Sequence, residues 1–260
     1  MMKKMIMVLL LLCLFSACQE KEEATEPTGT GGEDETVEGI SFEGRDLFLD
    51  LDVSDGTGFE WFPIYQSGNV EKKDSSYHVD REDPASTGGK ADVAFTFRVN
   101  DDEDALLIMK LARPWESDGS YEAYFIRMKD ASIDSVEDRS ASVYGDMQFI
   151  CESFGEDWIG VNIPRDWEYE IVENEEVHGF ALRPAGEKEY MQLLRYPSFV
   201  CDKEIRKIMI GEKGFDMGLD EEGKAVCLAG EDIVCLFEDA GWSQDRFYQI
   251  IEIVDNVRFE

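Results

Sequence analysis

The stretch Asp46-Leu47-Phe48-Leu49-Asp50-Leu51-Asp52-Val53 decides the fold of the first half of the chain. Leucine or valine stands at every second position, and aspartate occupies three of the four positions between them. A period of two over eight residues predicts a β-strand with one buried face and one solvated face. Phe48 is the exception, because it places a large apolar side chain on the polar face.

Further strands follow in the same half. Apolar residues again stand at every second position of residues 93–99, and residues 105–111 form a near-continuous apolar run. Such a run is typical of a central strand inside a sandwich. Residues 121–128 add an aromatic-rich strand, and clusters of Asp, Gly, Asn and Pro separate the runs. Short strands with regular turn signals predict an all-β, immunoglobulin-like sandwich over residues 40–130.

Short apolar runs also occur in the second half, after a polar segment at residues 131–145 that we interpret as a linker. We expect strands at residues 147–151, 159–163, 179–182, 191–194, 225–228 and 233–237. A helix is predicted to begin after Ser243, because apolar side chains recur at helical spacing over residues 247–254. This mixture predicts an α+β domain over residues 146–260.

The N-terminus has the pattern of a secretion signal. Two lysines precede an apolar run at residues 5–15, and small residues precede Cys18. The run is shorter than the about 20 apolar residues that a membrane span needs. We interpret residues 1–17 as a signal peptide that resembles a bacterial lipobox, which would make Cys18 the lipid-modified residue of a lipoprotein anchored outside the cytoplasm. The alternatives are an ordinary signal peptide and an uncleaved anchor.

Residues 18–39 are interpreted as a disordered acidic tether, because they contain eight acidic residues, one lysine and no aromatic side chain. The whole chain carries a formal net charge of −33. Nucleic acid and anionic lipid headgroups would repel such a chain, so a nucleic-acid function is excluded.

The sequence gives no sign of catalysis, and no cofactor or metal is expected. Only two histidines are present, His78 and His178, and no nucleophile elbow, phosphate loop or zinc motif occurs. The aspartate-rich stretch 50–56 does not fit a calcium loop, because its glycine is one position late and Trp61 replaces the final glutamate.

Four of the six cysteines of the chain lie in its second half. Cys227 and Cys235 flank a plausible hairpin turn at residues 229–232. In a secreted protein they could form a cross-strand disulfide, but two buried free thiols are an equal alternative.

Three loop motifs lie between the expected strands of the first half. They are Gly56-Thr57-Gly58 followed by Phe59-Glu60-Trp61, then Gly88-Gly89, and then Arg113-Pro114-Trp115-Glu116. In this order and on this scaffold they resemble the chagasin family of cysteine-protease inhibitors. The resemblance implies a β-sandwich that inserts three loops into the cleft of a papain-like cysteine protease. The contact residues that it implies are Gly56, Thr57, Gly58, Gly88, Gly89, Arg113, Pro114 and Trp115.

The chain departs from the family pattern in the first loop, where Ser54, Asp55 and Gly56 replace Asn-Pro-Thr, and in the second loop at Ser86. A loop without proline is less rigid, and Asp55 brings a negative charge toward a catalytic thiolate, so we expect a weaker or narrower inhibitor. Trp61 is expected in the core. The alternatives are a structural or adhesive envelope lipoprotein and a solute-binding lipoprotein that uses the second half.

The second half also resembles a known family. Pro164-Arg165-Asp166-Trp167, the run Gly179-Phe180-Ala181-Leu182 and the terminal helix are similar to the Mog1/PsbP-like α+β sandwich. This resemblance implies an adaptor or structural role for residues 146–260.

Overall fold

The computed structural model describes residues 39–79, 89–113, 122–138, 147–175, 177–187, 191–195, 201, 203–219, 225–238 and 244–259. These residues form mainly β-strands, and every strand pairing among them is antiparallel. In the first half the strands are β1 (Ile40–Glu43), β2 (Asp46–Asp55), β3 (Glu60–Ser67), β4 (Val70–Val79), β5 (Gly89–Val99), β6 (Ala105–Ala112), β7 (Glu122–Lys129) and β8 (Ser132–Asp138).

The second half contains the only helix among the described residues, α2 (Gln244–Asp255). Its strands are β9 (Met147–Phe154), β10 (Asp157–Pro164), β11 (Trp167–Glu173), β12 (His178–Pro184), β13 (Met191–Arg195), β14 (Lys203–Ile210), β15 (Lys213–Leu219), β16 (Ala225–Ala229), β17 (Val234–Glu238) and β18 (Arg258–Phe259). The predicted terminal helix is therefore confirmed.

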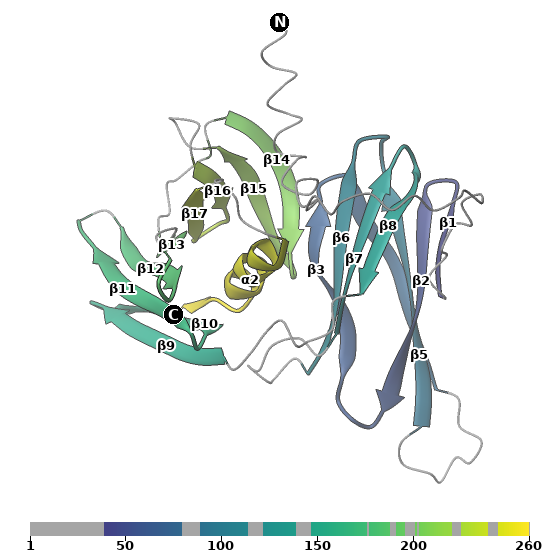
Figure 1. The fold of residues 1–260 in the computed structure, drawn as a ribbon, viewed down its shortest axis with the longest axis horizontal. Helices are drawn as coiled ribbons and strands as arrows, with labels where there is room; N and C mark the ends of the chain where they lie inside the picture. The colour runs from purple at the N-terminus through teal and green to yellow at the C-terminus, as the bar shows by residue number, and fades with distance from the viewer. Residues whose placement is uncertain are drawn as a thin grey trace, which may run out of the picture.

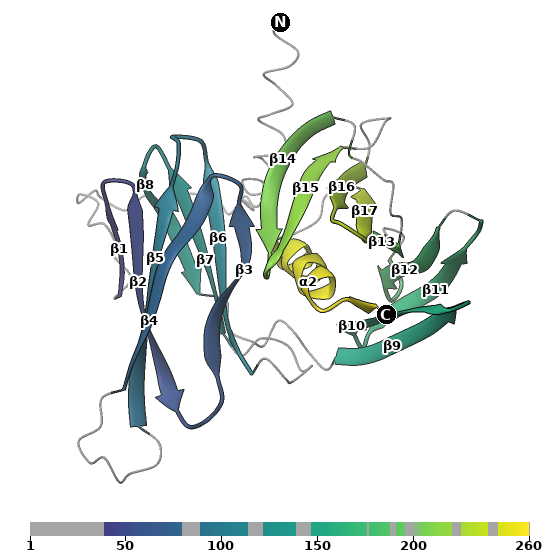
Figure 2. The same cartoon turned by 180° about the vertical axis from the view of Figure 1, so that it is seen from behind.

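The strands form three sheets. A four-stranded sheet has the order β1-β2-β5-β4, and a three-stranded sheet has the order β18-β10-β9. The third sheet has eleven strands in the order β11-β12-β13-β17-β16-β15-β14-β3-β6-β7-β8. Figures 1 and 2 show β14 beside β3, and α2 between the strands β14 and β15 and the strands β9 and β10.

The first core lies between the four-stranded sheet and the β3-β6-β7-β8 end of the long sheet. The expected alternation in β2 is confirmed, because Leu47, Leu49, Leu51 and Val53 are all buried there. Phe48 on the opposite face is exposed. Two packed antiparallel layers make this half an all-β sandwich, as predicted.

Strand β6 is buried on both faces, which explains its continuous apolar run. Leu107 and Met109 point into the first core, whereas Leu106 and Ile108 point into a second core. This second core lies between the long sheet, α2 and the three-stranded sheet. The face of β6 that points away from the first core therefore forms part of the wall of the second core.

The predicted α+β domain is wrong, since the described residues of the second half form one short helix and ten strands. Two of the strands missed by the sequence prediction are β14 and β15, which pair around a turn at Gly211. Their residues mix polar and apolar types without a clean period of two, and Ile205 of β14 places a large apolar side chain on an exposed position, so the sequence pattern does not reveal these strands.

The expected linker at residues 131–145 also needs correction, because β8 occupies residues 132–138 and pairs with β7. In addition, β14 hydrogen-bonds with β3, so one sheet runs through both halves. The division of the chain into two domains stays a prediction.

The cysteines pair differently from the expected pair. Cys227 forms a disulfide with Cys201, while Cys235 is a free buried thiol. In the β16–β17 hairpin Cys227 lies opposite Leu236, and Cys235 lies opposite Leu228, so the two cysteines point to opposite faces of the sheet. Burial raises the pKa of the Cys235 thiol. Neither of the two alternatives is therefore correct: Cys227 does not pair with Cys235, and of the two only Cys235 is a free thiol.

Candidate functional site

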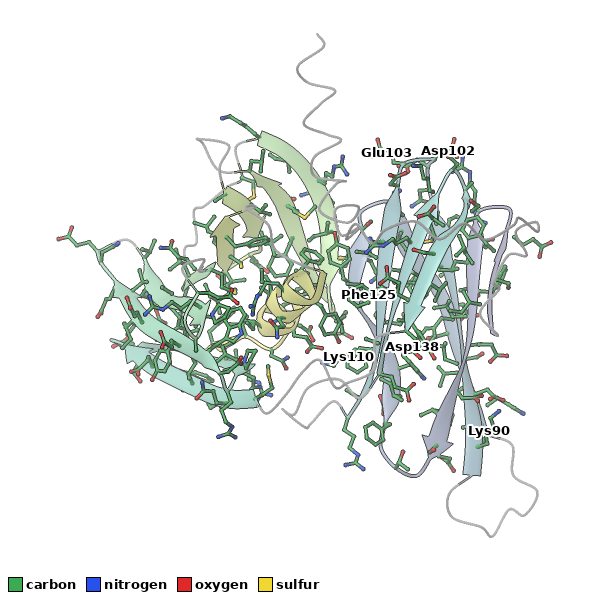
Figure 3. All side chains as sticks on the ribbon, in the orientation of Figure 1. Lys90, Asp102, Glu103, Lys110, Phe125 and Asp138 are labelled. Carbon is green, nitrogen blue, oxygen red and sulfur yellow. A yellow bond between two sulfur atoms is a disulfide. The ribbon has the colours of Figure 1, made fainter. Side chains whose placement is uncertain are left out.

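The connections between the antiparallel strands of the first half lie at two opposite ends. The turns β1–β2, β3–β4 and β5–β6 lie at one end, and the three loop motifs follow β2, precede β5 and follow β6 at the other. In Figure 3 Asp102 and Glu103 mark the first end, and Lys90 lies toward the second. The structure thus places the described motif residues at the same end.

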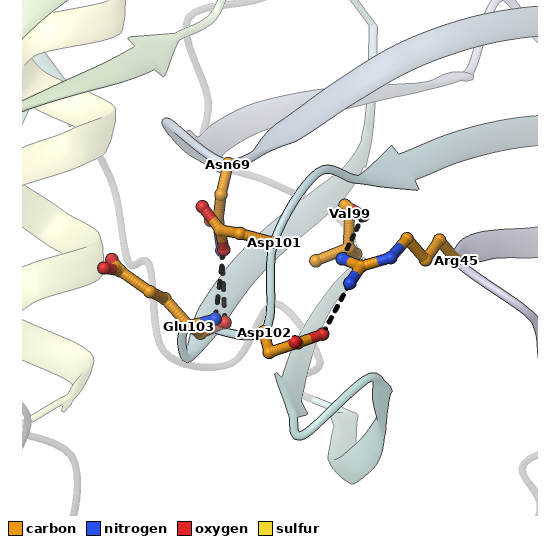
Figure 4. Close-up of polar contacts among 6 residues, drawn as sticks. All are labelled: Arg45, Asn69, Val99, Asp101, Asp102 and Glu103. Carbon is orange, nitrogen blue, oxygen red and sulfur yellow. Dashed lines mark hydrogen bonds and ion pairs between the residues drawn. The ribbon is translucent and has the colours of Figure 1, made fainter.

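A polar network fixes the turns at the end without motifs (Figure 4). Arg45 donates a hydrogen bond to Asp102 at 2.7 Å. Asn69 Nδ2 donates to Asp101 Oδ1 at 2.8 Å and to the Glu103 carbonyl at 3.1 Å. These contacts hold the three turns together, so we assign this end of the sandwich a structural role.

The first motif forms a tight turn after β2. Gly56 and Gly58 have φ values of 77° and 79°, a region that side chains with a Cβ disfavour. The Thr57 hydroxyl donates to the Ser54 carbonyl at 2.6 Å, and the Phe59 N–H donates to the Thr57 hydroxyl oxygen at 3.4 Å. The turn is thus held by its own residues even though it lacks proline.

Arg113 connects the third motif to the first. Its Nε donates to the Thr57 carbonyl at 2.9 Å, and its guanidinium lies 4.4 Å from the centre of the Phe59 ring. A planar cation can make both contacts at once, one in its plane and one on its face. Arg113 therefore braces the first loop.

The second motif joins the first through the sheet. Gly89 pairs with Asp55, the last residue of β2. The Asp55 carboxylate accepts a hydrogen bond from the Tyr77 hydroxyl at 3.0 Å, so it is tied to β4, the strand on the far side of β5. The sequence prediction missed Tyr77, because β4 is exposed along nearly its whole length and gives no alternating pattern.

Trp61 belongs to the core, as expected. It is buried, its ring stacks on Tyr124 with centroids 5.1 Å apart, and its indole N–H donates to the Asp52 carbonyl at 2.8 Å. The start of β3 is thereby fixed to β2 and β7, directly below the first motif.

Acidic side chains flank the motifs on the outer face of the four-stranded sheet. Asp52 and Asp92 lie opposite each other on β2 and β5, and hydrogen bonding to Asp52 raises the pKa of Asp92. Lys90 reaches the Asp52 carboxylate at 3.0 Å. This face therefore carries two carboxylates beside the loops, one of which is paired with Lys90.

We call Gly56, Thr57, Gly58, Gly89 and Arg113 the loop cluster. The other predicted contact residues, Gly88, Pro114 and Trp115, lie outside the described residues, as does Cys18. Within the described ranges no group of three His, Cys, Asp or Glu side chains could hold a metal ion. No helix among these residues is long and apolar enough to cross a membrane.

Comparison of the chain with protein-family models, with curated proteins and with solved structures finds no match. The function is therefore inferred from the loop cluster and its support.

Proposed function

We propose that the chain is a surface-anchored lipoprotein whose first half is an immunoglobulin-like sandwich that inhibits papain-like cysteine proteases. The loop cluster, together with Gly88, Pro114 and Trp115, would enter the active-site cleft. A lipid on Cys18 and the acidic segment 18–39 would hold this surface away from a bacterial membrane. The Cys201–Cys227 disulfide supports an extracytoplasmic location, since disulfides persist in oxidising compartments.

The observation that carries the proposal is the contact of Arg113 with Thr57 and Phe59. It joins two loops that are 56 residues apart in the sequence into one unit. Together with the Asp55–Gly89 pairing, it joins the described residues of three loop motifs that resemble those of one inhibitor family at one end of the sandwich. Loops that are ordered before binding lose less entropy when they bind.

The first loop suits a protease cleft for steric reasons. Glycines at its two turning points let the backbone approach a catalytic cysteine closely. The turn is closed by hydrogen bonds to Ser54, so its peptide bonds are not extended as those of a substrate are. Such a loop would bind without being cut.

Asp55 remains the reason to expect a weak or selective inhibitor, although its bond to Tyr77 draws the carboxylate to the side of the turn. A target with a basic rim around its cleft would tolerate the flanking Asp52 and Asp92 best. The proposal therefore favours a protease with a positively charged surface near the active site.

The test is a titration of the full chain against papain and a cathepsin L-type enzyme, with a fluorogenic peptide as substrate. We expect competitive inhibition and an uncleaved inhibitor. Trp115→Ala should weaken inhibition by about 2 kcal/mol or more, which is about 30-fold. Arg45→Ala, at the opposite end of the sandwich, is the matched control and should inhibit as the natural chain does. If the chain at micromolar concentration inhibits neither enzyme, the result would favour a structural or adhesive module.

A further inference from the structure

An ion pair joins the two halves of the chain inside the protein. Lys110 Nζ of β6 lies 2.6 Å from Glu252 Oε2 of α2, and the two side chains are only 8% and 3% exposed. The two residues are 142 positions apart in the sequence. Figure 3 shows Lys110 and Phe125 on the side of the first half that faces α2.

Further contacts surround this pair. The Tyr248 hydroxyl donates to Glu252 Oε1 at 2.6 Å, and the Tyr248 ring stacks on Phe125 of β7 with centroids 5.4 Å apart. On the other side, the Lys110 ammonium lies 5.6 Å from the centre of the Phe62 ring of β3. These contacts attach α2 to β6 and β7, and the Tyr65 ring of β3 also meets the Phe247 ring of α2 edge-on with centroids 5.5 Å apart.

Strand β14 holds only part of β3. The pairing covers Tyr65, Gln66 and Ser67, and the Gly211 N–H donates to the Ile64 carbonyl at 2.9 Å. From Glu60 to Pro63, β3 has β6 as its only partner among the described strands. This segment leads directly to the loop cluster.

The ion pair lies at the level of this singly paired segment. Phe62 pairs with Lys110 across β3 and β6, and Phe59 and Arg113 lie three residues further along the two chains, each one residue beyond the end of its strand. Three residues of a strand span about 10 Å. A displacement of β6 at Lys110 would therefore be transmitted to the Arg113 contact along a short, stiff path.

We infer that the second half of the chain is a brace for the loop cluster: α2, through the Lys110–Glu252 ion pair, positions the ends of β3 and β6 that carry Phe59 and Arg113. Lys110 and Glu252 are positioning residues in this view, since neither reaches the loop surface. The inference concerns the coupling of the two halves and holds whether or not the loops bind a protease.

Hydrogen exchange on the full chain tests the inference. Glu252→Gln removes the carboxylate that pairs with the buried Lys110 ammonium and leaves Asp255 as the acidic group beside it, so it should loosen the helix from β6. We expect amide exchange in residues 59–62 and 110–113 to rise about tenfold or more, with a smaller change in β2 and β5. Lys110→Met/Glu252→Gln balances the charges and keeps the packing, so it should restore the natural exchange rates in these segments.

Leu182→Ala is the matched control, because it removes a fully buried side chain of the second core on a strand that is distant in the sheet from β3 and β6. Leu182→Ala should lower the free energy of global unfolding without a selective rise in amide exchange near the loop cluster. The inference would be overturned if Leu182→Ala raised amide exchange in residues 59–62 and 110–113 as much as Glu252→Gln does. It would also be overturned if Glu252→Gln raised amide exchange uniformly over the chain. If Glu252→Gln does not fold, Tyr248→Phe must show the same regional pattern at smaller amplitude, and its absence would equally refute the brace.

Discussion

The ionised carboxylate of Asp255, at the end of α2, should lower the free energy of unfolding at neutral pH. Burial raises the pKa of this carboxyl from 3.8 to about 6; Glu252 and Glu212 act in the same direction, while Lys110 and Lys213 oppose it. The folded protein therefore favours the protonated acid. Because the pKa is higher in the folded state, the ionised group destabilises the fold above about pH 6, and this effect decreases as the pH falls toward 4.

The magnitude follows from the shift of about two pKa units, which corresponds to about 3 kcal/mol. Asp255→Asn has nearly the same shape without the charge, so it should be more stable than the natural chain by up to that amount at pH 7.5. The assay is urea unfolding at pH 7.5 and pH 4.5, with the gain expected to fall to about 1 kcal/mol at the lower pH, because the unfolded carboxyl is still mostly ionised there.

Asp232→Asn is the matched control for Asp255→Asn. It removes one negative charge from an exposed turn, and it should change the unfolding free energy by no more than about 0.5 kcal/mol. If Asp255→Asn is no more stable than this control at pH 7.5, or if its gain is the same at both pH values, burial of the Asp255 carboxyl does not act as argued.

Three other predictions concern the loops, the disulfide and the shared sheet. Gly58→Ala and Gly44→Ala replace glycines at positive φ at opposite ends of the sandwich, so each should lower stability by about 1 kcal/mol in urea unfolding, but only Gly58→Ala should weaken protease inhibition. Cys227→Ser opens a disulfide that spans 26 residues and should cost about 3.5 kcal/mol, whereas Cys151→Ser at an exposed free thiol should leave unfolding unchanged. Residues 40–138 alone, which keep β8, should bind a hydrophobic dye and melt below the full chain, because the outer face of β3, β6 and β7 loses its cover; a stable, dye-free fragment would contradict the shared core.

Strand existence in the first half could be predicted because burial on one face leaves a period of two. The alternation of β2 and the apolar run of β6 both follow from the sequence, and both are confirmed. Strand β4 could not be found in this way, since it is an edge strand whose residues are nearly all exposed. The motif glycines Gly56 and Gly58 indicated a turn, but the bond from Arg113 to Thr57 depends on the distance between two loops.

The pairing of Cys201 with Cys227 illustrates the same limit in the second half. Residue spacing suggested a hairpin pair, whereas the register of β16 and β17 turned Cys235 to the opposite face. Register depends on which side chains the whole sheet can bury, and a shift by one residue reverses every one of them.

By itself, the sequence determined the β character of the chain, its acidity and the three loop motifs, because local periodicity and composition are read directly from neighbouring residues. Only the tertiary structure decided that β14 continues the sheet of the first half and that Lys110 meets Glu252 inside it. Contacts over such separations depend on which segments bury the apolar faces of the strands. The second face of β6 is buried by residues more than a hundred positions away in the sequence.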